Sequence, residues 1–126
     1  MKKIINWFEQ HKKISFIILS IIFLVINYCS SIPGTSISFG SVFPSVFYHL
    51  GIFFLFTFFL LTIITNKKTN FKKICIAIAI SLILAILDEF HQSFVPFRDP
   101  NIQDVLTDLV GSTISILFTV TIKKLN

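Results

Sequence analysis

The sequence is poor in charged residues and lacks the short signatures by which many enzymes are recognised. Charged residues make up 13% of its 126 residues, against 54% hydrophobic residues and a mean hydropathy of +0.84. A soluble domain of this size carries about twice that share of charge. The sequence contains no HExxH pair, no nucleophile elbow and no Cys–His arrangement. This composition argues against the common soluble hydrolases and favours a protein that lies in a lipid bilayer.

Cysteine is equally scarce. The only two, Cys29 and Cys75, have no spacing typical of a metal or redox motif. In the topology predicted below they lie near opposite faces of the membrane, so they cannot form a disulfide within one chain. We expect both to be small apolar filling residues.

Lysine is the one abundant charged residue, and it occurs beside hydrophobic runs. The net charge is +5. The ten lysines form the pairs and clusters Lys2-Lys3, Lys12-Lys13, Lys67-Lys68 with Lys72-Lys73, and Lys123-Lys124. This placement is typical of membrane edges that face anionic lipid on the cytoplasmic side. We therefore expect membrane lipids, and no nucleic acid, as partners of the basic residues.

Four segments are long enough to cross a bilayer, which takes about 20 residues each. They cover about residues 14–30, 45–65, 74–94 and 101–122. The connections between them are short, so neighbouring segments are expected to pack antiparallel. No repeat or second domain is visible. The sequence predicts an all-α membrane protein, a single domain over residues 1–126, with four transmembrane helices in an antiparallel bundle.

The segment "KKIINWFEQHKK" precedes the first predicted span. The span follows a basic start, as in a signal peptide, but its apolar run is long and no small residue precedes Cys29 for a lipoprotein-type cut. We therefore interpret it as a retained anchor. The preceding segment is predicted to be an interfacial helix whose apolar side chains enter the headgroup region. Glu9 and His11 are expected to face solvent. The apolar side chains are Ile4, Ile5, Trp7 and Phe8.

The lysines also predict the orientation. All ten lie at the amino end, between the second and third spans, or at the carboxyl end. The connection over residues 31–44 has no charge, and the connection after the third span has only Arg98 and Asp99. The positive-inside rule then predicts that both termini are cytoplasmic. The segment from Asp88 to Asp108 belongs to the outer face.

That segment, "DEFHQSFVPFRDPNIQDVLTD", holds five of the six acidic residues and the only arginine. Asp88 lies fifteen positions above Lys73, and Asp108 lies fifteen above Lys123. At about 1.5 Å per residue, both carboxylates are about 22 Å above the inner edge. In a core about 30 Å thick, this depth is within the outer leaflet. The same count gives a second layer about 27–28 Å up, which contains His49, His91 and Asp104.

Helical periodicity points these polar residues into the bundle. On the third span Asp88, His91 and Gln92 share one side with three small residues, and Asp104 and Asp108 do so on the fourth. The small residues are Ala77, Ser81 and Ala85, and then Gly111, Ser112 and Ser115. Small residues permit close helix contact, and acids inside a membrane need partners. We therefore predict one site built from three helices.

For two acidic residues, Glu89 and Asp104, the sequence leaves alternatives open about where the side chain faces or what it does. Glu89 lies about 100° around the helix from Asp88, so it is predicted to face another helix or the outer connection. Asn101 is a candidate N-cap of the fourth span, with Asp104 in the first turn. A carboxylate there also stabilises the helix dipole, so Asp104 has a structural interpretation beside the functional one.

The same stretch, extended to "DEFHQSFVPFRDPNIQDVLTDLVG", resembles the VanZ-like family. That pattern has an Asp-Glu pair, then His-Gln, Pro-x-Arg, an Asp and a Gly at the start of the last span. In this chain these are Asp88, Glu89, His91, Gln92, Pro96, Arg98, Asp104 and Gly111. His49 in "YHLGIFF" and the stretch "SSIP" over residues 30–33 also fit. The resemblance covers nearly the whole chain.

The sequence departs from the family pattern at two positions. Phe97 stands where the family usually has a glycine, which is expected to change the shape of the connection. Asp108 stands where an asparagine is common. Its carboxylate adds a negative charge near Asp88, at a depth where two such charges repel. We expect at least one of the two acids to be protonated or bound to a cation.

The resemblance implies a place and a role, but no mechanism. The family takes its name from a protein that lowers susceptibility to teicoplanin, a lipoglycopeptide that acts at the outer membrane surface. A multi-pass protein of the bacterial plasma membrane with a role in the cell envelope is therefore implied. A link to antibiotic resistance is implied as well. The family has no settled catalytic reaction, so the resemblance implies no mechanism for this effect.

Three hypotheses follow for the polar residues. In the first, which we favour, the protein is not an enzyme, and the cluster binds a lipid headgroup, a lipid-linked envelope precursor or a lipoglycopeptide. Arg98 then suits a phosphate or carboxylate. The cluster consists of His49, Asp88, Glu89, His91, Gln92, Arg98, Asp104 and Asp108.

In the second hypothesis the chain is a small membrane enzyme acting on a lipid-linked envelope substrate. The acids and histidines then hold a divalent metal of open identity or act as acid and base. Its candidate residues are His49, Asp88, Glu89, His91 and Asp104. No cofactor follows from the sequence with certainty, and neither does an oligomeric state.

In the third hypothesis the network only stabilises the bundle. Arg98 then pairs with Asp99 or Glu89, and Asp88 is hydrogen-bonded to a histidine. Transport is the least favoured role, because four short spans without an inverted repeat make a poor carrier.

Overall fold

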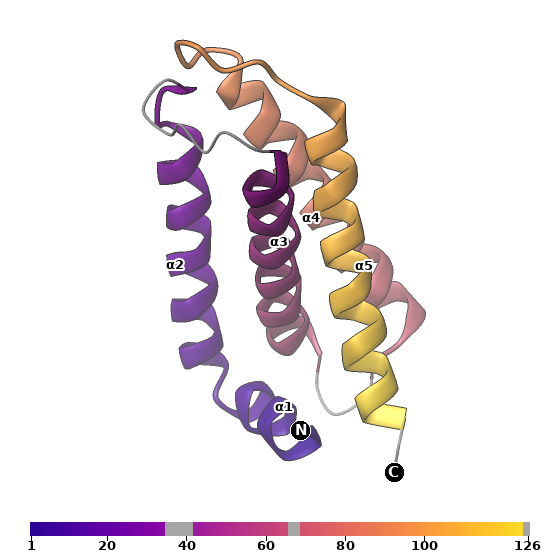
Figure 1. Cartoon of the computed structure of the whole chain (residues 1–126). Helices are drawn as coiled ribbons and strands as arrows, with labels where there is room; N and C mark the ends of the chain where they lie inside the picture. The colour runs from indigo at the N-terminus through magenta and orange to yellow at the C-terminus, as the bar shows by residue number, and fades with distance from the viewer. Residues whose placement is uncertain (35–41, 66–68, 125–126) are drawn as a thin grey trace.

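The computed structural model describes residues 1–34, 42–65 and 69–124, and over this part of the chain it contains five helices and no strand. The helices are α1 (Lys2–Gln10), α2 (Lys12–Ser30), α3 (Val42–Ile64), α4 (Phe71–Gln92) and α5 (Ile102–Lys124). The last four run alternately up and down beside one another (Figure 1). Each is long and apolar enough to cross a membrane. The predicted all-α architecture with four membrane-spanning helices is confirmed.

Local capping explains where two of the helices begin. At the start of α4 the Asn70 side chain accepts a hydrogen bond of 3.0 Å from the backbone N–H of Lys73. At the start of α5 the Asn101 side chain accepts one of 3.0 Å from the backbone N–H of Gln103. These bonds satisfy N–H groups that have no partner within the helix. The predicted cap at Asn101 is confirmed, and α4 begins three residues before the predicted Ile74.

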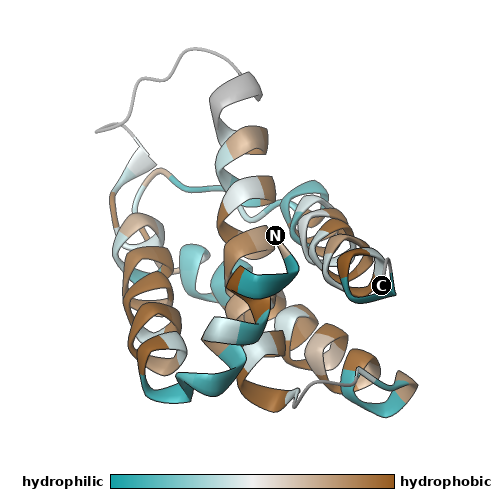
Figure 2. Cartoon of the chain, turned by 90° about the horizontal axis from the view of Figure 1, so that it is seen from below, coloured by the Kyte–Doolittle hydropathy of each residue, from teal (hydrophilic) through white to brown (hydrophobic). Residues whose placement is uncertain are grey.

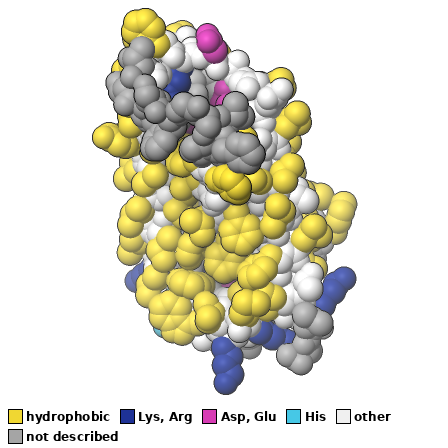
Figure 3. All heavy atoms as spheres, in the orientation of Figure 1, with side chains coloured by type: hydrophobic (Ala, Val, Ile, Leu, Met, Phe, Trp, Pro, Cys, Tyr) yellow, Lys and Arg dark blue, Asp and Glu magenta, His cyan; other side chains and the backbone are white. Residues whose placement is uncertain are grey.

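The outward-facing surface of the bundle is apolar. Figure 2 views the helices from the end at which both α1 begins and α5 ends, and hydrophobic residues dominate their flanks. Figure 3 shows apolar side chains over the middle of one face, with most of the basic side chains at one end and acidic side chains at the other. Strongly exposed examples are Phe16, Leu24, Ile83 and Leu117. Such a surface is stable in hydrocarbon and unfavourable in water.

Small and hydroxyl-bearing side chains lie among the large apolar side chains of the core around α3, which contacts all four other helices. Thr57 of α3 donates a hydrogen bond of 2.9 Å to Ser112 of α5 and shares one of 2.8 Å with Ser81 of α4. All three side chains are buried. Hydrogen bonds between membrane helices stabilise them by about 0.6 kcal/mol each. The predicted seams of small residues are confirmed: Ala77, Ser81, Ala85, Gly111, Ser112 and Ser115 are all buried.

The predicted solvent exposure of Glu9 is wrong. Glu9 is only 6% exposed, and its carboxylate accepts hydrogen bonds from the Thr65 hydroxyl and the Lys123 ammonium group. Helix α1 therefore crosses the end of the bundle against α2, α3 and α5 (Figure 2). A carboxylate can be buried there because a cation and a hydroxyl meet it. His11 is exposed, as predicted.

The charged ends of the molecule differ in sign. Eight of the ten lysines are described, and they belong to α1 and to the ends of α2, α4 and α5 at the same end of the molecule. They are Lys2, Lys3, Lys12, Lys13, Lys72, Lys73, Lys123 and Lys124; Lys67 and Lys68 lie outside the described residues. Residues 35–41, half of the uncharged connection over residues 31–44, also lie outside them. We call the lysine-bearing end the basic end.

The connection from α4 to α5 has an unusual backbone. Phe97 has a φ of 60°, and no other non-glycine residue in the described chain has a positive φ. This left-handed region is open to glycine but costs other residues about 1–2 kcal/mol. The connection packs on the chain that follows α2, because the Gly34 N–H donates a 3.3 Å hydrogen bond to the Pro96 carbonyl. The backbone conformation explains why a glycine suits this position in the family pattern.

Replacing Phe97 by glycine is therefore expected to stabilise the protein by about 1 kcal/mol, because the left-handed conformation no longer strains a side chain. Thermal unfolding of the purified protein in one detergent measures the change. Phe94→Gly is the matched control, since Phe94 is also exposed but has no positive φ, and it is expected to give no stabilisation. An equal or lower unfolding temperature for Phe97→Gly would contradict the interpretation.

Candidate functional site

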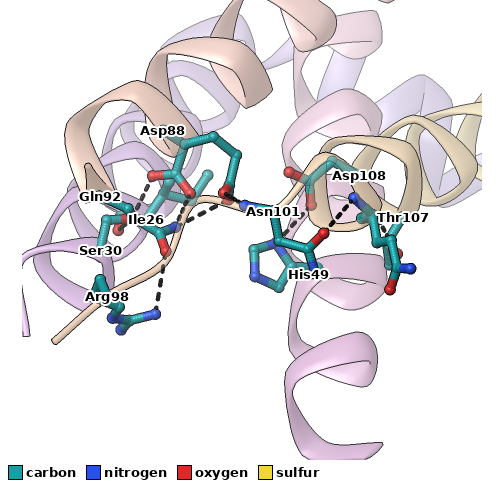
Figure 4. A network of polar contacts seen from close by, with 11 residues as sticks. Ile26, Ser30, His49, Asp88, Gln92, Arg98, Asn101, Thr107 and Asp108 are labelled. Carbon is teal, nitrogen blue, oxygen red and sulfur yellow. Dashed lines mark hydrogen bonds and ion pairs between the residues drawn. The ribbon is translucent and has the colours of Figure 1, made fainter. Parts of the chain in front are cut away.

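The eight predicted site residues all lie at the end of the bundle opposite the basic end. They come from α3, α4, the connection after α4, and α5 (Figure 4). We call them the polar cluster: His49, Asp88, Glu89, His91, Gln92, Arg98, Asp104 and Asp108. Five of them have side chains less than 10% exposed, whereas Arg98 and Asp104 are half-buried and His91 is exposed. Ionisable groups that are buried at a membrane-spanning depth must find partners within the protein.

On the α2 side, the cluster is organised around Asp88. Its carboxylate accepts hydrogen bonds from the Ser30 hydroxyl at the end of α2 and, at 3.0 Å, from the Gln92 amide (Figure 4). The same Gln92 nitrogen donates a bond of 3.2 Å to Glu89. Gln92 therefore bridges the carboxylates of two adjacent residues that lie one turn before it in α4. Ser30 was not predicted as a site residue, although its position at the outer end of the first span placed a hydroxyl at a suitable depth.

Arg98 holds the connection between α4 and α5 against α2. Its Nε donates to the Ile32 carbonyl at 3.1 Å, and its two terminal nitrogens donate to the Cys29 carbonyl at 2.9 Å and to Gln92 Oε1 at 3.3 Å. Carbonyls at the end of a helix lack partners within it, and a guanidinium group satisfies them well. Within residues 1–34, 42–65 and 69–124, neither salt bridge involves Arg98. The predicted pairing with Asp99 or Glu89 is not found.

His91 lies apart from the centre of the cluster. It is exposed, and its Nε2 is 3.0 Å from the Ser31 hydroxyl beyond the end of α2. The third hypothesis expected Asp88 to be hydrogen-bonded to a histidine. In the described structure its hydrogen-bond partners are Ser30 and Gln92 instead. His91 thus belongs to the rim that joins α4 to α2.

On the other side of the cluster, α3 and α5 meet through a buried pair. His49 Nδ1 is 2.9 Å from Asp108 Oδ1, and the two side chains are 5% and 0% exposed (Figure 4). In the depths predicted from the sequence, His49 belongs to the layer nearer the end of the bundle and Asp108 to the deeper layer, so the pair joins the two layers. The helices approach closely here, because Gly111 of α5 packs on the backbone of Leu50. Asp108 Oδ2 is buried and has no hydrogen-bond partner among the described atoms.

Three potential ligand-bearing residues converge between these two sides. His49 of α3, Glu89 of α4 and Asp104 of α5 each offer one nitrogen or oxygen atom, and these atoms lie within 4.8 Å of one another. Glu89 Oε2 accepts a 2.8 Å hydrogen bond from the backbone N–H of Asn101. Glu89 therefore faces the connection between α4 and α5, as predicted. The grouping brings an imidazole and two carboxylates from three helices to one place.

Negative charge outweighs positive charge in the polar cluster. Four carboxylates are present, Asp88, Glu89, Asp104 and Asp108, with Arg98 as the only permanent cation among the eight residues. Hydroxyl and amide donors lower the free energy of the buried carboxylates but do not neutralise them. In a low-dielectric region such a group of acids is stable when protons or a cation compensate the charge. The arrangement is therefore chemically suited to binding a cation or carrying a proton.

The VanZ/LLP1 family model matches residues 3–123, a range that includes all five helices except the ends of α1 and α5 and all eight residues of the polar cluster. No curated protein and no protein of solved structure matches the chain. The match covers far more than half of the sequence, and its extent agrees with the four apolar helices. The chain belongs to the VanZ/LLP1 family.

Proposed function

We propose that this chain is a multi-pass protein of the bacterial plasma membrane whose polar cluster binds the polar head of a membrane-embedded envelope molecule in the outer leaflet. The bound molecule is a lipid, a lipid-linked envelope precursor or a teicoplanin-type lipoglycopeptide. Through this binding the protein lowers the susceptibility of the cell to teicoplanin. The family match and the four apolar helices support the membrane part of the proposal.

The distribution of charge supports the orientation. The described lysines lie at the basic end, and the acidic residues after Glu9 lie at the opposite end or in its connection (Figure 3). Lysines are retained on the cytoplasmic side of membrane proteins. With both described termini at the basic end, the polar cluster then faces the outer leaflet, where envelope lipids and lipoglycopeptides present their polar groups.

The observation that carries the binding role is the convergence of His49, Glu89 and Asp104. Among the described residues, Asp108 is the only one of the four acids in an ion pair, which it forms with His49, whereas Arg98 is bonded to carbonyls and an amide. A purely structural network would be expected to pair its other acids with bases as well. The acids thus retain capacity for a ligand from outside. Arg98 supports the connection above the cluster through these bonds, and its suitability for a phosphate or carboxylate stays a prediction.

A second candidate function, a membrane enzyme acting on a lipid-linked envelope substrate, is favoured by the pair of His49 and Asp108. A carboxylate bonded to one imidazole nitrogen orients the ring and leaves the other nitrogen to exchange a proton. Glu89 and Asp104 lie beside this imidazole. The arrangement is the type of acid–base group that a small hydrolase or transferase would need.

Replacing Asp88 by asparagine is expected to abolish the protection. The change removes the charge at the centre of the α2 side and keeps the size of the side chain, so the hydrogen bonds of Ser30 and Gln92 must rearrange. Teicoplanin susceptibility is measured in cells that express the wild type or the variant at matched membrane levels. Susceptibility with Asp88→Asn is expected to equal that of cells without the protein.

Asp99→Asn is the control for this experiment, because Asp99 is exposed in the connection that follows α4 and has the same charge as Asp88. It is expected to protect as well as the wild type. Protection by Asp88→Asn would contradict the assigned role of the cluster, and no protection by the wild type would contradict the function itself. Mass spectra of lipid-linked precursors from the same cells separate the two candidates, since only an enzyme changes their chemical composition.

A further inference from the structure

We propose that His49, Glu89 and Asp104 bind one divalent transition-metal ion, such as Zn²⁺ or Mn²⁺, and that Asp108 orients the histidine from behind. The inference concerns the same cluster as the proposed function and names the ion through which it acts. The metal lies where α3, α4 and α5 meet. It is held by three protein ligands and keeps at least one coordination position for water or for an oxygen of the bound envelope molecule.

The first support is distance. The ligand atoms of the three residues lie within 4.8 Å of one another. Atoms that share a zinc ion at about 2.1 Å are about 3.4 Å apart in tetrahedral geometry. The three side chains therefore need to close by about 1.4 Å at most, which rotations of Glu89 and Asp104 supply. Each residue comes from a different helix, so a metal here would also join α3, α4 and α5.

The second support is the state of the histidine. His49 Nδ1 is 2.9 Å from Asp108 Oδ1, so Nε2 is the nitrogen left to donate its lone pair to a metal. A histidine that binds a metal commonly gives its other N–H to a carboxylate, which holds the ring in place and makes it a stronger ligand. Both side chains are at least 95% buried. Asp108 is the residue that departs from the asparagine of the family pattern, and a carboxylate serves this role better than an amide does.

The third support is charge. Neither of the two salt bridges in the described chain involves Glu89 or Asp104. Glu89 accepts one hydrogen bond on each oxygen, from Gln92 and from the Asn101 backbone, and each oxygen keeps a lone pair for a metal. A divalent ion would compensate the negative charge that the cluster otherwise places in a low-dielectric region.

The ligand types indicate the class of metal. Two carboxylates and one imidazole suit ions of the zinc and manganese kind. Calcium prefers six to eight oxygen ligands, and magnesium keeps most of its water and rarely takes an imidazole. Three protein ligands with an open position are the arrangement of metal sites that also bind a substrate or another ligand. The exchangeable ligand here is an oxygen anion, such as a phosphate or carboxylate of an envelope molecule.

Metal binding is tested on the purified full chain in detergent micelles. The protein is treated with a chelator, then dialysed against Zn²⁺, Mn²⁺ or Mg²⁺ in turn, and bound metal is measured by elemental mass spectrometry. We expect about one Zn²⁺ or Mn²⁺ per chain and much weaker binding of Mg²⁺. Glu89→Gln and Asp104→Asn are each expected to weaken binding by about 100-fold, and Asp108→Asn by about 10-fold.

Two variants serve as controls. Asp99→Asn removes an exposed carboxylate, and His11→Gln removes an exposed imidazole at the basic end, so neither is expected to change metal binding. Asp104→Asn is the decisive ligand variant, because the half-buried Asp104 side chain has no hydrogen bond in the described structure and its loss should leave the fold intact. Helix content and elution volume equal to those of the wild type verify this.

The outcomes separate the inference from the proposed function. A wild-type chain that binds no metal, or Glu89→Gln and Asp104→Asn variants that bind as tightly as the wild type, would overturn the metal site. If the wild type binds metal through these residues but gives no protection from teicoplanin, the metal site stands and the proposed function fails. If it protects without binding metal, the function stands and the inference fails.

Discussion

Replacing Gly111 by alanine is expected to destabilise the protein by about 1–3 kcal/mol, the usual cost of forcing an atom into a packed interior. A Cβ atom at this position would lie 2.5 Å from the Leu50 carbonyl oxygen and 3.1 Å from its Cα. Both atoms belong to the backbone of α3, so they cannot rotate out of the way. Helices α3 and α5 must therefore move apart where they pack.

The same separation acts on the polar cluster. Gly111 lies three residues after Asp108 in α5, and Leu50 follows His49 in α3. Moving the two backbones apart lengthens the 2.9 Å contact between His49 and Asp108. We therefore expect Gly111→Ala to lose teicoplanin protection as well as stability. Larger residues such as valine are expected to have a stronger effect.

Gly51→Ala is the matched control. A Cβ atom at Gly51 would meet nothing within 4 Å, although this glycine also lies in α3, one residue beyond Leu50. Alanine in a helix interior is favoured over glycine by about 1 kcal/mol, so this variant is expected to be as stable as the wild type or more stable. Thermal unfolding in one detergent compares the two. Equal unfolding temperatures for both variants would show that the close approach at Gly111 is unimportant.

Replacing Lys123 by methionine is expected to cost about 3 kcal/mol or more. The change keeps the apolar stem of the side chain but removes the ammonium group that donates to Glu9. Glu9 is 6% exposed, and removing one partner of a buried ion pair leaves a charge that solvent does not stabilise. We expect α1 to detach from the end of the bundle before the four spans unfold, because α1 contacts the rest of the chain through this end.

A double variant identifies the cause of this loss. Glu9→Gln combined with Lys123→Met removes both charges and is expected to recover most of the stability, because an amide is less costly to bury than a carboxylate. Lys124→Met removes an exposed lysine of the same helix and is expected to have little effect. Protease accessibility of the amino-terminal segment in micelles reports the detachment of α1. A double variant as unstable as Lys123→Met would argue against the ion pair as the cause.

The membrane-spanning helices were predictable from sequence because length and hydropathy along the chain suffice to define them. The buried faces of α4 and α5 were also predictable, since small residues repeat there at helical spacing. Asp88 and Asp108 could be placed at one end because α4 and α5 have lysines near their other ends, which served as reference points for depth. Each of these features depends on residues that are close in sequence.

The contacts that sequence reasoning missed depend on residues that are far apart. Glu9 and Lys123 are 114 positions apart, and nothing near Glu9 in sequence indicates that the end of α5 lies above it. The partners of Arg98 are mainly backbone carbonyls 66 and 69 positions away, and carbonyl groups leave no mark on the sequence. His91 shares a helix side with Asp88, yet it lies one turn higher and reaches the rim at Ser31.

The pairing of His49 with Asp108 has a consequence for how the protein is made. The two residues are 59 positions apart, and synthesis delivers α3 and α4 to the membrane before α5. Until α5 arrives, His49 lacks Asp108, and Glu89 lacks the N–H of Asn101. A nascent chain at this stage exposes ionisable groups to lipid, which favours its retention beside the insertion machinery or its recognition by membrane proteases. We therefore expect release into the bilayer during synthesis to follow the docking of the last helix.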